Sequence, residues 1–293
     1  MVLAAVATIF LLGLGLGLTA CDELGARTLV QKGNALYDDQ EYEKAIDKYE
    51  AALKKSPGLM VIHHNLGLAY ARLFRPGVET DENKAYVNNA ALHLQKWLEK
   101  HPNDLKVQKF LLNLWIDAAE YKPVLDYFMA QYQKDPNNRY VVGKIAGLYL
   151  MMTDWRTAID WRYKDLALAA DDPAKVAVYK EITNTAFGQL WTSTARMKQR
   201  GADRAELAEI GLKAAEDGLA IDPDNIQLNS FSQGLWNQRA IAEGPYWGAA
   251  IDRAEAQIFE QRVRVLSEEA KKNQPPAPPP GSPTTPATPA TGS

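Results

Sequence analysis

Apolar residues in the body of this 293-residue chain recur at helical rather than alternating spacing. Between Ala26 and Leu53 they lie at Leu29, Leu36, Ala45, Ile46, Tyr49, Ala52 and Leu53, among which separations of three, four and seven positions recur. This spacing places them on one face of an α-helix. No run of alternating β-branched residues lies between turn signals from residue 26 to residue 272. The pattern therefore predicts an all-α body.

Small and bulky residues also follow a fixed order in this body. The first helix pair has small residues at Gly33, Ala45 and Ala52, an aromatic residue at Tyr49 and a proline at Pro57. This order resembles the tetratricopeptide repeat, a unit of about 34 residues in which small residues lie where two antiparallel helices touch. Each pair of such helices buries its apolar face against the next pair. The resemblance implies a right-handed superhelical solenoid of about six helix pairs over residues 21–272.

The later repeats depart from this pattern in ways that predict local differences. About eleven extra residues, around 75–84, interrupt the second repeat. In the third repeat Leu112 replaces the glycine, so the two helices of that repeat should lie further apart. Gly147 and Ala158 indicate a fourth repeat that is one residue short in its inner turn. A sixth repeat, from residue 226 to residue 272, ends in a long charged helix that suits a polar cap on the stack.

Residues 1–20 are uncharged and largely apolar, and they end at Leu18-Thr19-Ala20-Cys21. This arrangement resembles a bacterial lipoprotein signal peptide, in which the only cysteine of the chain, Cys21, would become the lipid attachment site and carry acyl chains such as palmitate. Such a lipid would hold the protein on a membrane. The alternative is a retained transmembrane helix, because twenty residues just cross a bilayer of about 30 Å. No basic residue precedes Val2, so we expect the natural start to lie upstream.

Residues 273–293 contain half of the 16 prolines and no charged residue. Such a segment cannot bury enough apolar surface to offset the entropy of ordering it. We expect a disordered Pro-rich tail that acts as a spacer; a docking peptide or a glycosylated tip is the alternative.

Charge and motif content exclude several classes of function. The balance of 33 basic against 36 acidic residues gives no sign of a nucleic-acid partner. The four histidines form no i, i+4 pair of the kind that binds zinc, so we expect no metal. Asp222 and Asp224 are interpreted as helix caps rather than calcium ligands. No G-x-S-x-G motif occurs, so we expect neither enzymatic activity nor a cofactor.

The resemblance to tetratricopeptide repeats also implies where a partner would bind. The first helix of each pair lines the groove, which places Arg27, Asn34, Tyr37 and Asp38 there, followed by Asn65 and Lys106 in the next two units. Some members of the family hold a C-terminal carboxylate in a clamp of Lys, Asn, Asn, Lys and Arg. Asn34, Asn65 and Lys106 match its middle positions, but Val30 and Phe110 replace the outer cations. The segment from Trp155 to Tyr163 is the best candidate for an exposed aromatic patch.

These features together predict a membrane-anchored periplasmic lipoprotein that scaffolds or assembles a cell-envelope complex. Its build is similar to that of pilotins and of accessory subunits of outer-membrane assembly machines, and this similarity favours the outer membrane over the inner membrane. Asp22 after the cysteine is an inner-membrane signal in enteric bacteria and argues the other way. The alternative function is a groove-based receptor for a peptide or glycan ligand, which would show a compact, aromatic-lined pocket.

Overall fold

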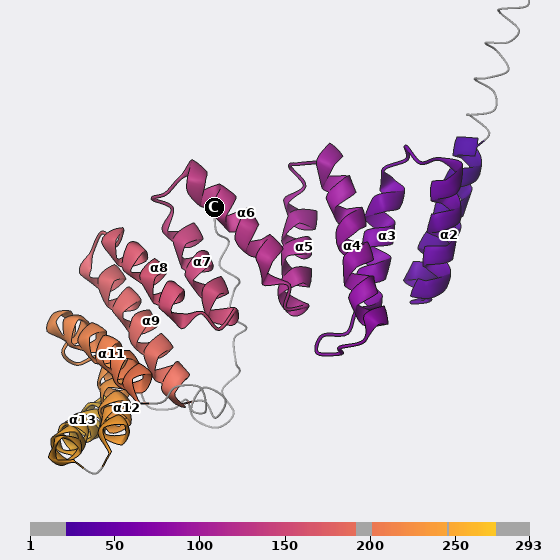
Figure 1. The fold of residues 1–293 in the computed structure, drawn as a ribbon. Helices are drawn as coiled ribbons and strands as arrows, with labels where there is room; N and C mark the ends of the chain where they lie inside the picture. The colour runs from indigo at the N-terminus through magenta and orange to yellow at the C-terminus, as the bar shows by residue number, and fades with distance from the viewer. Residues whose placement is uncertain (1–21, 192–200, 245, 274–293) are drawn as a thin grey trace, which may run out of the picture. The chain divides into compact units, whose positions relative to one another are not determined.

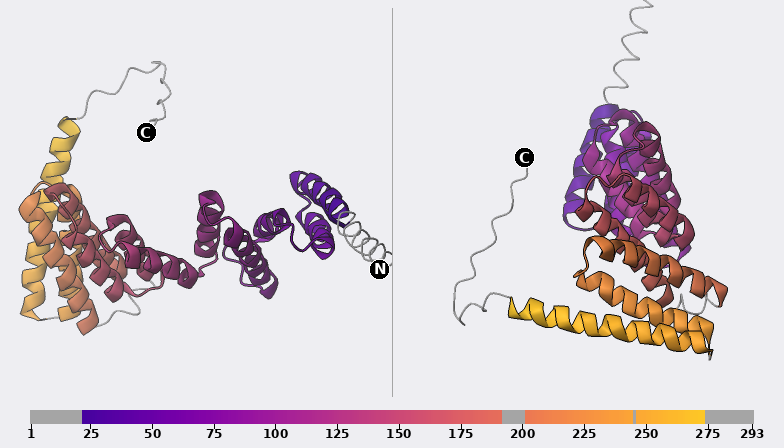
Figure 2. Two further views of the ribbon diagram at one scale, coloured as in Figure 1. Left: turned by 90° about the horizontal axis from the view of Figure 1, so that it is seen from above. Right: turned by 90° about the vertical axis from the view of Figure 1, so that its left-hand side faces the viewer.

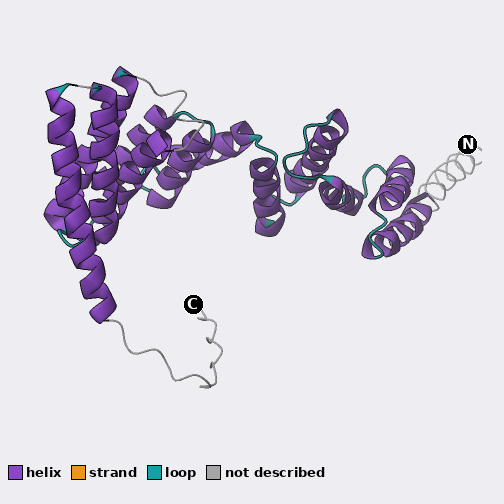
Figure 3. Cartoon of the chain, turned by 90° about the horizontal axis from the view of Figure 1, so that it is seen from below, coloured by secondary structure: helices purple, strands orange, loops and turns teal. Residues whose placement is uncertain are grey.

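The computed structural model describes residues 22–191, 201–244 and 246–273. All regular secondary structure in these ranges is helical (Figures 1 and 3), which confirms the all-α prediction. The predicted signal peptide, Cys21 and all but the first residue of the predicted tail lie outside the described residues.

The described helices follow one another as six pairs, as the repeat pattern predicts. They are residues 22–38 with α2 (Tyr42–Lys55), α3 (Val61–Leu73) with α4 (Asp81–Lys100), α5 (Leu105–Asp117) with α6 (Tyr121–Lys134), α7 (Arg139–Met151) with α8 (Trp155–Ala167), α9 (Asp172–Trp191) with α11 (Ala202–Ile221), and α12 (Ile226–Glu243) with α13 (Trp247–Lys272). The chain divides into two compact units, residues 1–130 and residues 131–293.

Short polar side chains fix where several helices begin. Asp104, Asn138 and Asp154 accept a hydrogen bond from a backbone N–H in the first turn of α5, α7 and α8. Such caps satisfy amides that have no partner inside the helix. At the boundary before α12 the cap is Asn225, not the aspartates that the sequence suggested. Asp222 instead accepts a hydrogen bond from the Asn225 side chain at 2.9 Å.

Glycines allow close contact within the first two pairs. A Cβ added at Gly33 would lie 2.5 Å from a ring carbon of the buried Tyr49, and one added at Gly67 would lie 2.6 Å from Leu94 Cγ. Ala45 and Ala52 are fully buried in the same cluster as Tyr49. The small-residue positions of the repeat therefore lie where two helices touch, as their pattern predicts.

The third and fourth pairs show what happens when that glycine is absent. Backbone contact between α5 and α6 is weaker than between α3 and α4, in line with the substitution by Leu112. In the fourth pair the sequence assignment was one residue out. Ala146 is buried, whereas a Cβ added at Gly147 would meet nothing within 4 Å. Ala146 therefore takes the small position, and the inner turn of this pair has normal length.

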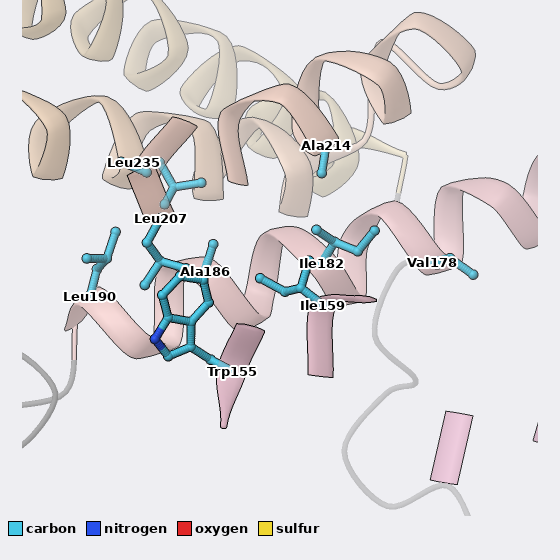
Figure 4. Packing of buried hydrophobic residues seen from close by; sticks show 10 residues of the cluster. Trp155, Ile159, Val178, Ile182, Ala186, Leu190, Leu207, Ala214 and Leu235 are labelled. Atoms are coloured by element: carbon cyan, nitrogen blue, oxygen red, sulfur yellow. The ribbon is translucent and has the colours of Figure 1, made fainter. Parts of the chain in front are cut away.

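The core of the second unit is built from four helices (Figure 4). Trp155 and Ile159 of α8 pack with residues of α9, α11 and α12, among them Ile182 and Leu235. Trp155 and Trp161 are each only 5% exposed. The predicted aromatic patch at residues 155–163 is therefore wrong for its two tryptophans, because both are core residues.

The insertion in the second pair is an ordered loop. Residues 74–80 separate α3 from α4, and the buried Asn83 at the start of α4 holds this loop. Its amide nitrogen donates to the backbone oxygens of Arg75 and Val78 at 2.9 and 2.8 Å, and its oxygen accepts from Arg75 N at 2.8 Å. One side chain thus satisfies three backbone groups of the loop.

Candidate functional site

The two asparagines predicted to face a partner lie together in the first unit. Asn34 is on the helix of residues 22–38, and Asn65 is on α3, the first helix of the next pair. Asn34 Oδ1 accepts two hydrogen bonds, from Asn65 Nδ2 at 2.8 Å and from the Tyr49 hydroxyl at 2.8 Å. These bonds fix the orientation of the Asn34 amide. Its Nδ2 group has no hydrogen-bond partner within the described part of the chain, so it can donate to a bound molecule.

A small cavity of about 210 Å³ opens beside this asparagine pair. Its lining residues are Asn34, Tyr37, Asp38, Tyr49, Asn65 and Leu68. Burial raises the pKa of Tyr49 to about 12, with Tyr37 and Asp38 adding to the effect, so its hydroxyl stays protonated. Tyr37 OH accepts a hydrogen bond from Arg72 Nε at 3.0 Å. The cavity therefore presents one amide donor, one carboxylate and an apolar side chain.

The other predicted groove residues lie away from this cavity. Arg27 is exposed and pairs with Glu23, four residues earlier on its own helix, at 2.7 Å. Lys106 is exposed in the first turn of α5 and does not line the cavity. Val30, at the first clamp position, is buried in the core, while Phe110 is 37% exposed. The structure thus brings together Asn34, Tyr37 and Asn65, and leaves both predicted cations outside the cavity.

A histidine pair that the sequence did not reveal lies between α3 and α4. The Nδ1 atoms of His63 and His93 are 2.8 Å apart, so one ring donates a hydrogen bond and the other accepts it. The ring of Tyr70 stacks on His93, and its hydroxyl donates to Glu50 at 2.7 Å. Burial, with smaller effects of His63 and Lys96, lowers the pKa of His93 to about 4. Burial also lowers the pKa of His63. The pair is therefore neutral at pH 7.

The second unit has an aromatic cavity of its own. It measures about 560 Å³ and is lined by Phe187, Trp191, Arg204, Ser230, Gln233, Gly234, Asn237, Gln238 and Ile241. The rings of Phe187 and Trp191 stack with centroids 5.2 Å apart. Gly234 makes room for this arrangement, because a Cβ there would lie 2.3 Å from the Phe187 ring. The sequence did not single out these residues, since a phenylalanine and a tryptophan four positions apart on a helix also fit a buried core.

The described residues contain neither a candidate membrane span nor a candidate metal cluster. None of their helices is both long enough and apolar enough to span a membrane. They contain no group of three or more His, Cys, Asp or Glu side chains that could hold a metal ion.

Comparison with known proteins identifies one segment of the chain. Residues 33–73 match the family described as "TPR repeat". Two crystal structures of MamA proteins share 14% identity with the chain; one covers 75% of it and 98% of its own length at a TM-score of 0.42, and the other covers 82% and 96% at 0.32. A tetratricopeptide repeat protein from Parabacteroides merdae shares 13% identity and covers 83% and 99% at 0.36. No curated protein matches the chain. Residues 33–73, which span the asparagine pair, therefore match a tetratricopeptide repeat.

Proposed function

We propose that this protein is a membrane-anchored scaffold that binds a cell-envelope protein through the cavity beside Asn34 and Asn65. Tetratricopeptide repeats indicate protein–protein interaction, and the chain carries such a repeat at residues 33–73. The observation that carries the proposal is the fixed Asn34 amide. Its oxygen accepts two hydrogen bonds, whereas its Nδ2 group donates none within the described residues. A preorganised donor of this kind suits a backbone carbonyl of a bound polypeptide.

The charge of the cavity favours a neutral or cationic segment of the partner. Asp38 contributes a carboxylate to the lining, and Arg27 and Lys106 lie outside it. A C-terminal carboxylate would therefore be repelled by Asp38, while Arg72, which bonds the Tyr37 hydroxyl, is not itself part of the lining. This argues against the carboxylate clamp that Asn34, Asn65 and Lys106 resemble, and in favour of recognition of an internal segment.

The membrane part of the proposal rests on the sequence at residues 18–21. A lipid on Cys21 would tether the first unit close to a membrane surface, since the helix of residues 22–38 follows directly. Together with the resemblance to a lipoprotein signal, this supports a periplasm-facing protein in a bacterial envelope. The outer membrane is favoured, by similarity to pilotins.

The test separates binding from stability with a nearly isosteric change. Asn34→Asp keeps an oxygen that can accept from Tyr49 and Asn65 but replaces the free amide donor with a second acceptor. We expect it to melt close to the parent and to lose the envelope partner in affinity capture from membranes. Lys106→Ala is the matched control, because Lys106 is also exposed in the first unit but lies outside the cavity. Equal capture by the parent and Asn34→Asp would refute the proposed site.

A second candidate function, a receptor for a peptide or glycan, is favoured by the aromatic cavity of the second unit. Stacked rings and side-chain amides are groups that bind sugar rings and peptide bonds. Trp191 is 50% exposed, and Gln233 and Asn237 lie on the neighbouring α12. Soluble glycan and peptide fragments that quench tryptophan fluorescence in the parent but not in a Trp191→Ala variant would support this alternative.

A further inference from the structure

The last helix of the second unit carries an apolar stripe on its outward face. On α13, Trp247 is 79% exposed, Ile251 49%, Ile258 59% and Val265 42%. The last three recur at intervals of seven residues, which returns each to nearly the same side of a helix. The sequence suggested that this helix is a polar cap. Its charged residues are present, but the face turned to solvent also contains a line of large apolar side chains.

This stripe is separate from the face that packs α13 onto its own unit. The buried residues of α13 are Ala249, Asp252, Ala256 and Leu266, and they lie on the side toward α12. Asp252 accepts hydrogen bonds from Arg239 of α12 at 3.0 and 2.6 Å, which fixes the rotation of the helix. Figure 2 shows α13 along the edge of this unit, beside α12. Folding of the unit therefore leaves the stripe exposed.

We propose that the stripe of α13 pairs, in antiparallel orientation, with the stripe of a second copy of this chain. Exposed β-branched residues seven positions apart form one line of apolar contacts along a helix, which is one of the two core rows of a coiled-coil seam. A twofold axis near Ile258 places that residue against its own counterpart and places Ile251 against Val265 of the second copy. From Trp247 to Val265 the stripe runs about 27 Å, at 1.5 Å per residue. Such an interface is isologous, the commonest kind among homodimers.

Charges beside the stripe select the antiparallel orientation. Glu255 and Arg262 lie on the same flank of α13, one before and one after Ile258; Arg262 is exposed, and Glu255 is half-buried where α13 meets α11 and α12. In the antiparallel pair Glu255 of each copy lies near Arg262 of the other, which gives two ion pairs. A parallel pair would bring opposite flanks together and separate these charges. In the single chain Arg262 bonds Asp224, and both are exposed, so this contact costs little to rearrange.

The same charges argue against a membrane surface as the occupant. Helices that lie in a membrane interface carry mostly Lys and Arg on the polar face. The exposed charges of α13 are mixed along its length: Arg253, Glu260, Arg262, Arg264, Glu268, Glu269, Lys271 and Lys272. A second copy, with its own alternating charges, matches this pattern better.

The first experiment is sedimentation equilibrium of the full chain in a density-matched detergent. We expect a concentration-dependent dimer for the parent. Ile258→Glu, which places two carboxylates at the twofold axis, should raise the dimer dissociation constant about 100-fold or more, as expected for a central apolar contact present on both sides. Ile241→Glu is the matched control, because Ile241 is also an isoleucine and is 60% exposed, but it lies on α12. It should leave the dimer unchanged.

A charge exchange tests the orientation. Glu255→Arg alone and Arg262→Glu alone each oppose like charges in the antiparallel pair and should weaken the dimer, whereas the double variant should restore it. A parent that is monomeric at all concentrations would overturn the proposal. So would a dimer that Ile258→Glu leaves intact, a double variant weaker than both single variants, or a monomer whose stripe binds phosphatidylglycerol vesicles instead.

Discussion

The histidine pair of the first unit, buried His63 and half-buried His93, should make the protein sensitive to mild acid. A histidine with an ordinary pKa of 6.5 in the unfolded chain takes up a proton below that pH, whereas folded His93, with a pKa of about 4, does not. Between these values the unfolded state binds more protons than the folded state, so the free energy of unfolding falls as pH falls. The full stabilisation is present above pH 6.5, and it is lost progressively down to pH 4.

The size of the effect follows from the two pKa values. A difference of 2.5 pKa units corresponds to about 3 kcal/mol over the whole range, since each unit is worth about 1.4 kcal/mol. Between pH 7 and pH 5 the linkage relation gives a loss of about 2 kcal/mol from His93 alone. That window lies above the range in which most carboxylates titrate. His63, whose pKa is also lowered, adds to the loss in the same direction.

Urea unfolding at pH 7, 6 and 5 measures this loss, with His93→Gln as the test variant. Glutamine can still hydrogen-bond His63 but cannot take up a proton. Its free energy of unfolding should therefore fall by about 2 kcal/mol less than that of the parent between pH 7 and pH 5. Tyr70→Phe is the control, because it removes the hydroxyl that bonds Glu50 but keeps both the ring stacked on His93 and the titrating group. It should lower stability by the same amount at each pH. If His93→Gln and the parent show the same pH slope, His93 is not protected from protonation, and the pairing inferred from the 2.8 Å contact is wrong.

Three further predictions concern packing, anchoring and the tail. Gly67→Ala should lower the free energy of unfolding by about 1–3 kcal/mol, because its Cβ would overlap Leu94, which is fully buried; Gly147→Ala, where a Cβ meets nothing, should be neutral or stabilising in the same urea assay. Cys21→Ser should abolish acyl labelling and let uncleaved protein accumulate, and normal processing of this variant would end the lipoprotein interpretation. Deletion of residues 273–293 should change the free energy of unfolding by less than about 0.5 kcal/mol; a larger loss would show that the tail packs on the folded body.

The sequence predicts the helix pairs well because their signals are local. Gly33, Ala45 and Ala52 are small for a steric reason that acts between neighbouring helices, and Tyr49 fills the gap that they leave. Because the pattern is repeated, a clear repeat also guides the assignment of helices in the next one. Where the pattern weakens, the residue that takes the small position of the repeat is harder to identify. In the fourth repeat the sequence favours Gly147 for this position, although the neighbouring Ala146 is the residue that packs.

The candidate site was less predictable because it depends on contacts between repeats. The family pattern placed Asn34 and Asn65 on the same surface, but it could not show that Tyr49 and Asn65 both donate to Asn34 Oδ1. Arg27 lies outside the cavity for a different reason. Glu23, one turn earlier on the same helix, offers it a local ion pair at 2.7 Å.

Tryptophan shows most clearly why exposure is hard to read from sequence. Trp155 and Trp161 stand beside arginines, which suggested an exposed patch, yet both are buried, and Arg156 reaches across to Asp203 and Glu206 of α11. Trp247 has no arginine beside it in the sequence and is 79% exposed. The difference arises from position in the stack. α8 is covered by α9, whereas no further helix of the described residues packs on the far side of α13. An apolar stripe at the end of a stack would remain a liability for aggregation unless something covers it. A second copy of the same stripe would cover it with complementary charges, and the line of exposed apolar residues on an otherwise charged helix is why we place the interface on α13.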